Sequence, residues 1–137
     1  MNATILALLG YIIWIMIMLL ALASYRTVFN QLQKRTSLVF KADGSDVGAL
    51  GQRLTRAHLN AVECFPFIGG IMLLALAINA SAITNALAFI VLGARLAQSI
   101  IHISSISNAA VILRFVFFLV QFGICAYWAV MLLIKFL

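Results

Sequence analysis

The sequence predicts an all-α integral membrane protein, a bundle of four transmembrane helices in a single domain that covers residues 1–137. Of the 137 residues, 66% are hydrophobic and only 9% are charged, whereas about a quarter of the residues in a soluble domain are charged. Four apolar stretches are each long enough to cross the roughly 30 Å hydrocarbon core of a bilayer. Lipid offers no partner to free backbone N–H and C=O groups, so these stretches are expected to be helices.

The predicted membrane-spanning helices are residues 5–24, 57–79, 83–104 and 111–134. The first contains no charge, and no Lys or Arg precedes it as in a signal peptide, so we expect it to be retained. The third is interrupted only by Arg95, and the fourth carries Arg114 near its start.

The connection 25–56 sets the predicted orientation. It carries six Lys or Arg residues against two Asp residues, and the positive-inside rule therefore makes it a cytoplasmic loop. Four spans then place both termini on the opposite side. The net charge of +6 comes from basic residues that are too sparse and too embedded in apolar runs for a nucleic-acid surface, so no nucleic-acid partner is predicted.

Cysteine and carboxylate residues give no sign of a disulfide or a metal site. Cys64 and Cys125 lie in separate apolar stretches and are expected to be buried free thiols. The segment 43–46, Asp-Gly-Ser-Asp, predicts a turn. Two carboxylates without the rest of a calcium-binding pattern are weak evidence for a metal, so none is predicted.

Polar residues in or next to the spans are the candidate site. A charge at mid-membrane costs about 2.5–3.5 kcal/mol on insertion scales, so such residues usually face a bundle interior or a cavity. Around the start of the second span, spacings of three, four and three residues place Arg53, Arg56, Asn60 and Glu63 on one helix face, and His58 points elsewhere. The candidates are Arg53, Arg56, His58, Asn60, Glu63, Arg95, Gln98, His102 and Arg114.

The predicted topology brings these residues into the same half of the membrane, in one polar pocket open to the cytoplasm. Four arginines face a single acid, Glu63, which suits a ligand with several anionic groups and one ammonium. Packing roles remain open as alternatives. Arg56 and Glu63 can pair across subunits, Arg53 and Arg114 can reach lipid headgroups, and Gln98 can form a simple interhelical hydrogen bond.

The segment 53–67, Arg-Leu-Thr-Arg-Ala-His-Leu-Asn-Ala-Val-Glu-Cys-Phe-Pro-Phe, resembles the signature of the MAPEG family, the membrane-associated proteins in eicosanoid and glutathione metabolism. Every fixed position of the pattern R-x-x-R-A-x-x-N-x-x-E-x-x-P is filled. Ala94-Arg95-Leu96 and Arg114 add support, and the loop 41–47 is similar to that of bacterial members.

The resemblance implies a homotrimer of four-helix protomers, and the similarity to bacterial members points to a bacterial inner membrane. In that membrane, the orientation predicted from the loop 25–56 makes both termini periplasmic. It implies glutathione as co-substrate, bound between subunits near the cytoplasm. Glu63 would take its amine, the arginines its carboxylates, and Arg114 would be the catalytic residue that stabilises the thiolate. The residues that would hold glutathione are Arg53, Arg56, Asn60, Glu63, Arg95, Gln98 and His102.

The implied function is a glutathione-dependent transferase or peroxidase. A nearby cation lowers the pKa of a thiol from about 8.5, and the thiolate can attack an apolar electrophile or a lipid peroxide from the bilayer. Many enzymatic members have tyrosines where this chain has Gln98, His102 and Phe118. The alternative is therefore a non-catalytic lipid- or ligand-binding protein of the same family. A channel or transporter is disfavoured, because the chain has no inverted repeat or broken helix.

Overall fold

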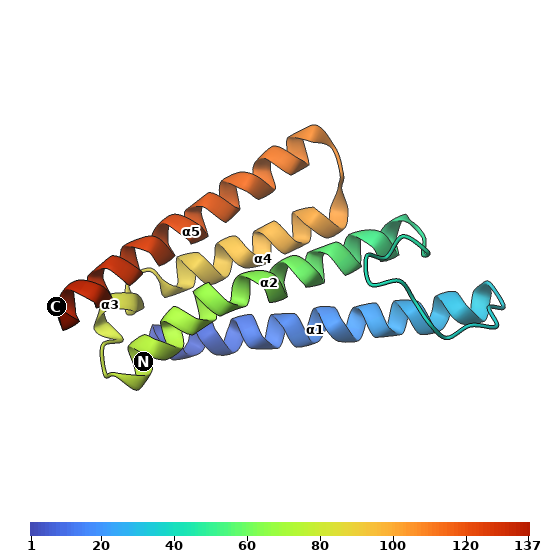
Figure 1. The fold of residues 1–137 in the computed structure, drawn as a ribbon. Helices are drawn as coiled ribbons and strands as arrows, with labels where there is room; N and C mark the ends of the chain where they lie inside the picture. Colours follow the sequence, from blue (N-terminus) through green and yellow to red (C-terminus); the bar gives the residue numbers. More distant parts are fainter.

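Five helices and no strands make up the computed structural model, which describes all 137 residues (Figure 1). In chain order the helices are α1 Ala3–Leu32, α2 Ala49–Ala77, α3 Ala82–Asn85, α4 Ala88–Ser104 and α5 Asn108–Phe136. The protein is therefore all-α, as predicted.

Three of the helices, α1, α2 and α5, are long and apolar enough to cross a membrane. The apolar helix α4 is shorter, at 17 residues, which corresponds to about 26 Å and lies at the lower limit for a span. Helix α4 lies at the centre of the bundle, where it packs against α1, α2 and α5. Helices α1 and α5 lie on opposite sides of the bundle and do not contact each other (Figure 1).

The third predicted span, 83–104, is interrupted in the structure. Helix α3 ends at Asn85 and α4 begins at Ala88. The Oγ1 atoms of Thr4 and Thr84 are 2.6 Å apart, and Asn85 Oδ1 accepts hydrogen bonds from the Thr4 amide at 3.0 Å and the Thr4 hydroxyl at 2.8 Å. These contacts fix the short helix α3 to the start of α1, and α4 then begins as a separate helix.

Helices α1 and α2 extend beyond the predicted spans. Helix α1 continues to Leu32 and α2 begins at Ala49, so the connection predicted over 25–56 is non-helical only over residues 33–48. The 30 residues of α1 correspond to about 45 Å, which exceeds the thickness of the hydrocarbon core. Both helices therefore project beyond the hydrocarbon core at the end of the bundle where the loop 33–48 connects them.

Local contacts order the loop 33–48. Arg35 forms an ion pair with Asp46 at 3.8 Å and stacks on the Phe40 ring with its guanidinium carbon 4.3 Å from the ring centre. The Ser45 amide donates to Asp43 Oδ1 at 3.0 Å, as expected for the predicted turn. This backbone hydrogen bond, with a second one from the Ser45 side chain, lowers the pKa of the Asp43 carboxyl.

The core combines small residues, which let helices approach closely, with a few large side chains. Cys64 and Cys125 are buried and free, as predicted. The small apolar residues that are at most 1% exposed are Ala7, Ala57, Ala61, Ala75, Ala80 and Ala88, and the large ones are Tyr11, Ile68, Met72, Val91 and Trp128.

Tyr11 joins α1 to α2 through a buried hydrogen bond. Its hydroxyl donates to the Ala61 carbonyl oxygen at 2.7 Å, five residues before Pro66, which lies inside α2 and has no N–H to donate. The Tyr11 ring also meets the Phe65 ring edge-on, with 5.4 Å between the centroids. The carbonyl that loses its helical donor at Pro66 is that of Val62, so the Tyr11 bond is an additional contact to the neighbouring carbonyl and serves to join α1 to α2.

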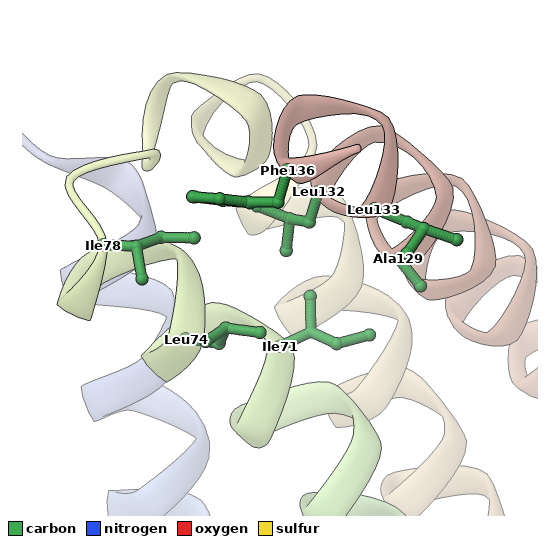
Figure 2. Close-up of a pocket in the computed structure, with 7 residues that line it drawn as sticks. All are labelled: Ile71, Leu74, Ile78, Ala129, Leu132, Leu133 and Phe136. Atoms are coloured by element: carbon green, nitrogen blue, oxygen red, sulfur yellow. The ribbon is translucent and has the colours of Figure 1, made fainter.

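The end of the bundle that holds α3 carries an apolar pocket of about 440 Å³ between α2 and α5 (Figure 2). In Figure 2 the Phe136 ring reaches from α5 toward α2, and no polar side chain lines the space. The pocket itself therefore has no side chain that could hold an anion. The lining residues are Ile71, Leu74, Ile78, Ala129, Leu132, Leu133 and Phe136.

The substitution Tyr11→Phe should lower the free energy of unfolding by about 1 kcal/mol, because it removes one buried hydrogen bond and keeps the ring contacts. Thermal unfolding in detergent measures the change. Tyr127→Phe is the matched control, since Tyr127 is half exposed and makes no side-chain hydrogen bond. Equal unfolding curves for the two variants would contradict the role assigned to the Tyr11 hydroxyl.

Candidate functional site

Two adjoining cavities lie between α2, α4 and α5 at the other end of the bundle, and together they are called the polar groove. They have volumes of about 210 and 240 Å³ and share His102, Val111 and Arg114. The first is also lined by Asn60, Gln98, Phe115 and Phe118. The second is also lined by Ala49, Gln52, Arg53, Arg56 and Ile106.

Three arginines line the groove, and no acidic residue does: Arg53, Arg56 and Arg114. The one ion pair of the protein lies in the loop 33–48, so none of these arginines has an acidic partner in the protomer. The Nε of Arg114 is buried and makes no hydrogen bond. An unneutralised cluster of this kind favours carboxylate, phosphate or thiolate groups.

Local structure positions the groove residues. Arg53 and Arg56 are three residues apart on α2 and therefore project to similar directions. The Nε of Arg53 donates to the Ile103 carbonyl oxygen at 2.6 Å, near the end of α4, where backbone carbonyls lack helical partners. This bond ties α2 to α4 beside the groove.

The structure brings most of the predicted site residues together. The resemblance assigns eight residues to the glutathione site, and two of them, Glu63 and Arg95, do not line the groove. The other six do: Arg53, Arg56, Asn60, Gln98, His102 and Arg114. The sequence predicts that these residues lie in the same half of the bundle, and in the structure these six line one groove at one end.

Glu63 lies on the exposed side of α2 and lines neither cavity. It is seven residues, or about two turns, beyond Arg56, which is also exposed. A ligand in the groove of one protomer is therefore not held by the Glu63 carboxylate of that protomer. His58, which the helix spacing separates from the other polar residues, also lies outside both cavities.

Arg95 is completely buried behind the groove. Its Nη1 donates to Asn60 Oδ1 at 2.7 Å, and its guanidinium carbon lies 5.6 Å from the centre of the Tyr11 ring. Its Nε and Nη2 have no hydrogen-bond partner. A buried charge with so few partners carries a large desolvation free energy, so Arg95 destabilises the ligand-free bundle.

A row of amides continues from Arg95 through the bundle. Gln98 Nε2 donates to Asn60 Oδ1 at 3.3 Å, and Gln121 Nε2 donates to Gln98 Oε1 at 2.9 Å and to the Phe117 carbonyl oxygen at 2.8 Å. The row joins α4, α2 and α5. Sequence reasoning missed Gln121, although a lone amide two turns after Arg114 in an apolar span is a usable signal.

A family model of the MAPEG family matches residues 4–134. The chain belongs to the MAPEG family. The resemblance predicted from the signature on the second span is thus confirmed. No curated protein and no solved structure matches the chain.

In this MAPEG chain, the signature supplies three groove residues from α2: Arg53, Arg56 and Asn60. Gln98, His102 and Phe118 are the positions at which the chain departs from the tyrosines of many members, and all three line the first cavity. The departures therefore alter the part of the groove next to Arg114. They leave that cavity with amide, imidazole and guanidinium groups and no hydroxyl.

The substitution Arg95→Met should stabilise the ligand-free protein by about 1 kcal/mol or more, because it removes a buried charge that has no counterion in the protomer. It should also reduce the rise in melting temperature caused by an anionic ligand such as glutathione. Melting curves in detergent with and without glutathione measure both effects. Leu96→Met, an apolar replacement on the same helix, is the control, and a lower melting temperature for ligand-free Arg95→Met would contradict the prediction.

Proposed function

We propose that this protein is a membrane-bound glutathione-dependent transferase or peroxidase that acts on apolar electrophiles or lipid peroxides. Glutathione binds as an Arg114-stabilised thiolate in the polar groove, between subunits of a homotrimer. The protein lies in a bacterial inner membrane with periplasmic termini, so the groove faces the cytoplasm, where water-soluble thiols have access to it.

One observation carries this proposal: the groove is lined by Arg53, Arg56 and Arg114 and by no acidic residue. Glutathione has two carboxylates, and a thiolate adds a third negative charge, so three arginine side chains complement it. The buried, unpartnered Nε of Arg114 offers a donor to the sulfur.

The trimer is supported by the side chains that the protomer leaves exposed. Glutathione also has an ammonium group, and Glu63 is the only acidic residue on the membrane-spanning helices. It lies outside the groove of its own protomer, so we propose that it reaches the ligand of a neighbouring copy. A site of this kind is complete only in the oligomer.

The chemistry follows from the charge of Arg114. A nearby cation lowers the pKa of a thiol, and the thiol proton leaves to solvent. In conjugation, the thiolate sulfur forms a bond to an electrophilic carbon. Either a leaving group departs from that carbon, or the atom that receives the displaced electron pair takes up a proton. In peroxide reduction, the sulfur attacks one peroxide oxygen, the O–O bond breaks and the alkoxide is protonated. A second glutathione then gives the disulfide and water.

A second candidate is a non-catalytic lipid- or ligand-binding protein. It is favoured by Gln98, His102 and Phe118, which leave the first cavity without a hydroxyl. The basic second cavity also suits a phospholipid headgroup. Copurified lipid that glutathione does not displace would support this candidate.

The substitution Arg114→Ala tests the proposal. The apparent pKa of bound glutathione thiol should rise by about one unit or more, and thiol transfer should fall about tenfold at neutral pH. Ultraviolet difference absorbance reports the thiolate, and conjugation of a panel of apolar electrophiles reports activity. Lys135→Ala, which removes an exposed cation at the apolar end of α5, is the control. Unchanged thiolate and activity in Arg114→Ala would refute the assignment.

Subunit mixing tests the shared site. Arg114→Ala and Glu63→Gln homotrimers should both have low activity. A mixed trimer contains one interface with an intact Glu63 on one subunit and an intact Arg114 on the next, so mixing the two variants before reconstitution should restore part of the activity. Mixtures that stay as inactive as the separate variants would place both residues in the site of one protomer.

A further inference from the structure

The amide row behind the groove has only one possible orientation. Arginine donates hydrogen bonds and accepts none, so the Asn60 atom 2.7 Å from Arg95 Nη1 must be the oxygen. The Gln98 atom that contacts this oxygen must then be its NH₂ group. The hydrogen-bond partners therefore determine which atom of each amide is the oxygen and which is the nitrogen.

The other end of the row imposes the same order. The Phe117 carbonyl oxygen only accepts hydrogen bonds, so the Gln121 group 2.8 Å from it must be the NH₂. That NH₂ also lies 2.9 Å from Gln98, which must present its oxygen there. Arg95 at one end and a backbone carbonyl at the other thus orient three side-chain amides in series.

The orientation determines what Asn60 presents to the groove. Its oxygen already accepts two hydrogen bonds, from Arg95 and Gln98, while its NH₂ group makes none within the protomer. Asn60 lines the first cavity together with Arg114. The amide is therefore fixed as a donor in the same space as the guanidinium of Arg114.

Few other donors are available in this cavity. The Gln98 amide is used by Asn60 and Gln121, and Val111, Phe115 and Phe118 have no polar side-chain atoms. His102 can either donate or accept. Besides Arg114, the row fixes the NH₂ groups of Asn60 and Gln98 as donors. The buried Gln98 already donates to Asn60, whereas the Asn60 NH₂ makes no hydrogen bond within the protomer.

We propose that Asn60 donates a second hydrogen bond to the thiolate that Arg114 stabilises, and that Gln98, Gln121 and Arg95 are positioning residues that hold Asn60 in this orientation. This inference rests on the proposed function and assigns the reacting sulfur, rather than the peptide backbone of glutathione, to Asn60. The substrate class is an anionic sulfur nucleophile, since a neutral thioether gains little from two donors.

Arg95 adds an electrostatic contribution. Its charge is completely buried and is not neutralised within the protomer, and charges act more strongly through a low-dielectric interior than through water. Through its hydrogen bond it also polarises the Asn60 amide, which strengthens the N–H groups on the groove side. Both effects favour a negative charge in the first cavity.

The decisive variant is Asn60→Asp. An aspartate keeps an acceptor for Arg95 and nearly the same shape, but it has no N–H to donate and places a negative charge at the groove. The apparent pKa of the bound thiol should rise so that the thiolate fraction near neutral pH falls about tenfold or more. Affinity for S-methylglutathione, which has no thiol to ionise, should fall less than affinity for glutathione.

Gln121→Met tests the positioning role without touching the groove, because Gln121 is completely buried and lines neither cavity. It frees Gln98 to rotate, so the thiol pKa should rise, by less than in Asn60→Asp. Cys125→Ala is the matched control, since Cys125 lies one turn further along α5, is also buried and makes no hydrogen bond. It should leave the thiol pKa unchanged.

The outcomes separate the inference from the function on which it rests. Wild-type protein that binds no glutathione or forms no thiolate overturns the proposed function and the inference with it. A wild-type thiolate that persists unchanged in Asn60→Asp overturns the inference alone. If Asn60→Asp does not assemble, Gln121→Met decides, and a thiol pKa equal to that of Cys125→Ala then overturns the inference.

Discussion

The hydrogen bond between Arg95 and Asn60 is the interaction on which the rest of the site depends. It joins α4 to α2 in the middle of the bundle, and it fixes the polarity of every amide that follows, through Gln98 to Gln121. Because Arg95 is fully buried, the bond also limits how the helices can move apart without exposing a charge to lipid. The short helix α4 is therefore held by polar contacts as well as by apolar packing.

The two ends of the bundle differ in chemistry, and this difference constrains the ligand. One end has an apolar pocket into which the Phe136 ring reaches (Figure 2), and the other has a groove with three arginines. Phe115 and Phe118 line the groove beside Arg114, so apolar surface continues up to the cations. A charged molecule from water and an apolar molecule from lipid can therefore meet at the groove, whereas the pocket at the opposite end suits only the apolar one.

Hydropathy was sufficient to predict the helical class and the membrane location, since few charges interrupt the spans. It missed the extensions of α1 and α2, because those turns carry polar residues with Arg26, Arg53 and Arg56 among them and lie beyond the apolar stretch. The break before α4 depends on contacts between Thr4 and Asn85, 81 residues apart, which no local pattern reveals. Helix spacing correctly grouped Arg53, Arg56 and Asn60, but the burial of Arg95 and the outward position of Glu63 depend on how the helices pack.

The unpaired charges also link ligand binding to stability. The protomer holds four arginines in or behind the groove without an acidic partner: Arg53, Arg56, Arg95 and Arg114. Like charges in a weakly solvated space repel one another, and this repulsion destabilises the empty bundle. An anionic ligand that binds only the folded form would offset this repulsion and stabilise the protein by an amount that grows with the ratio of its concentration to its Kd. Four unpaired arginines therefore lower the folding stability of a bundle without a ligand. The same arginines provide binding energy where the bundle holds an anion next to lipid.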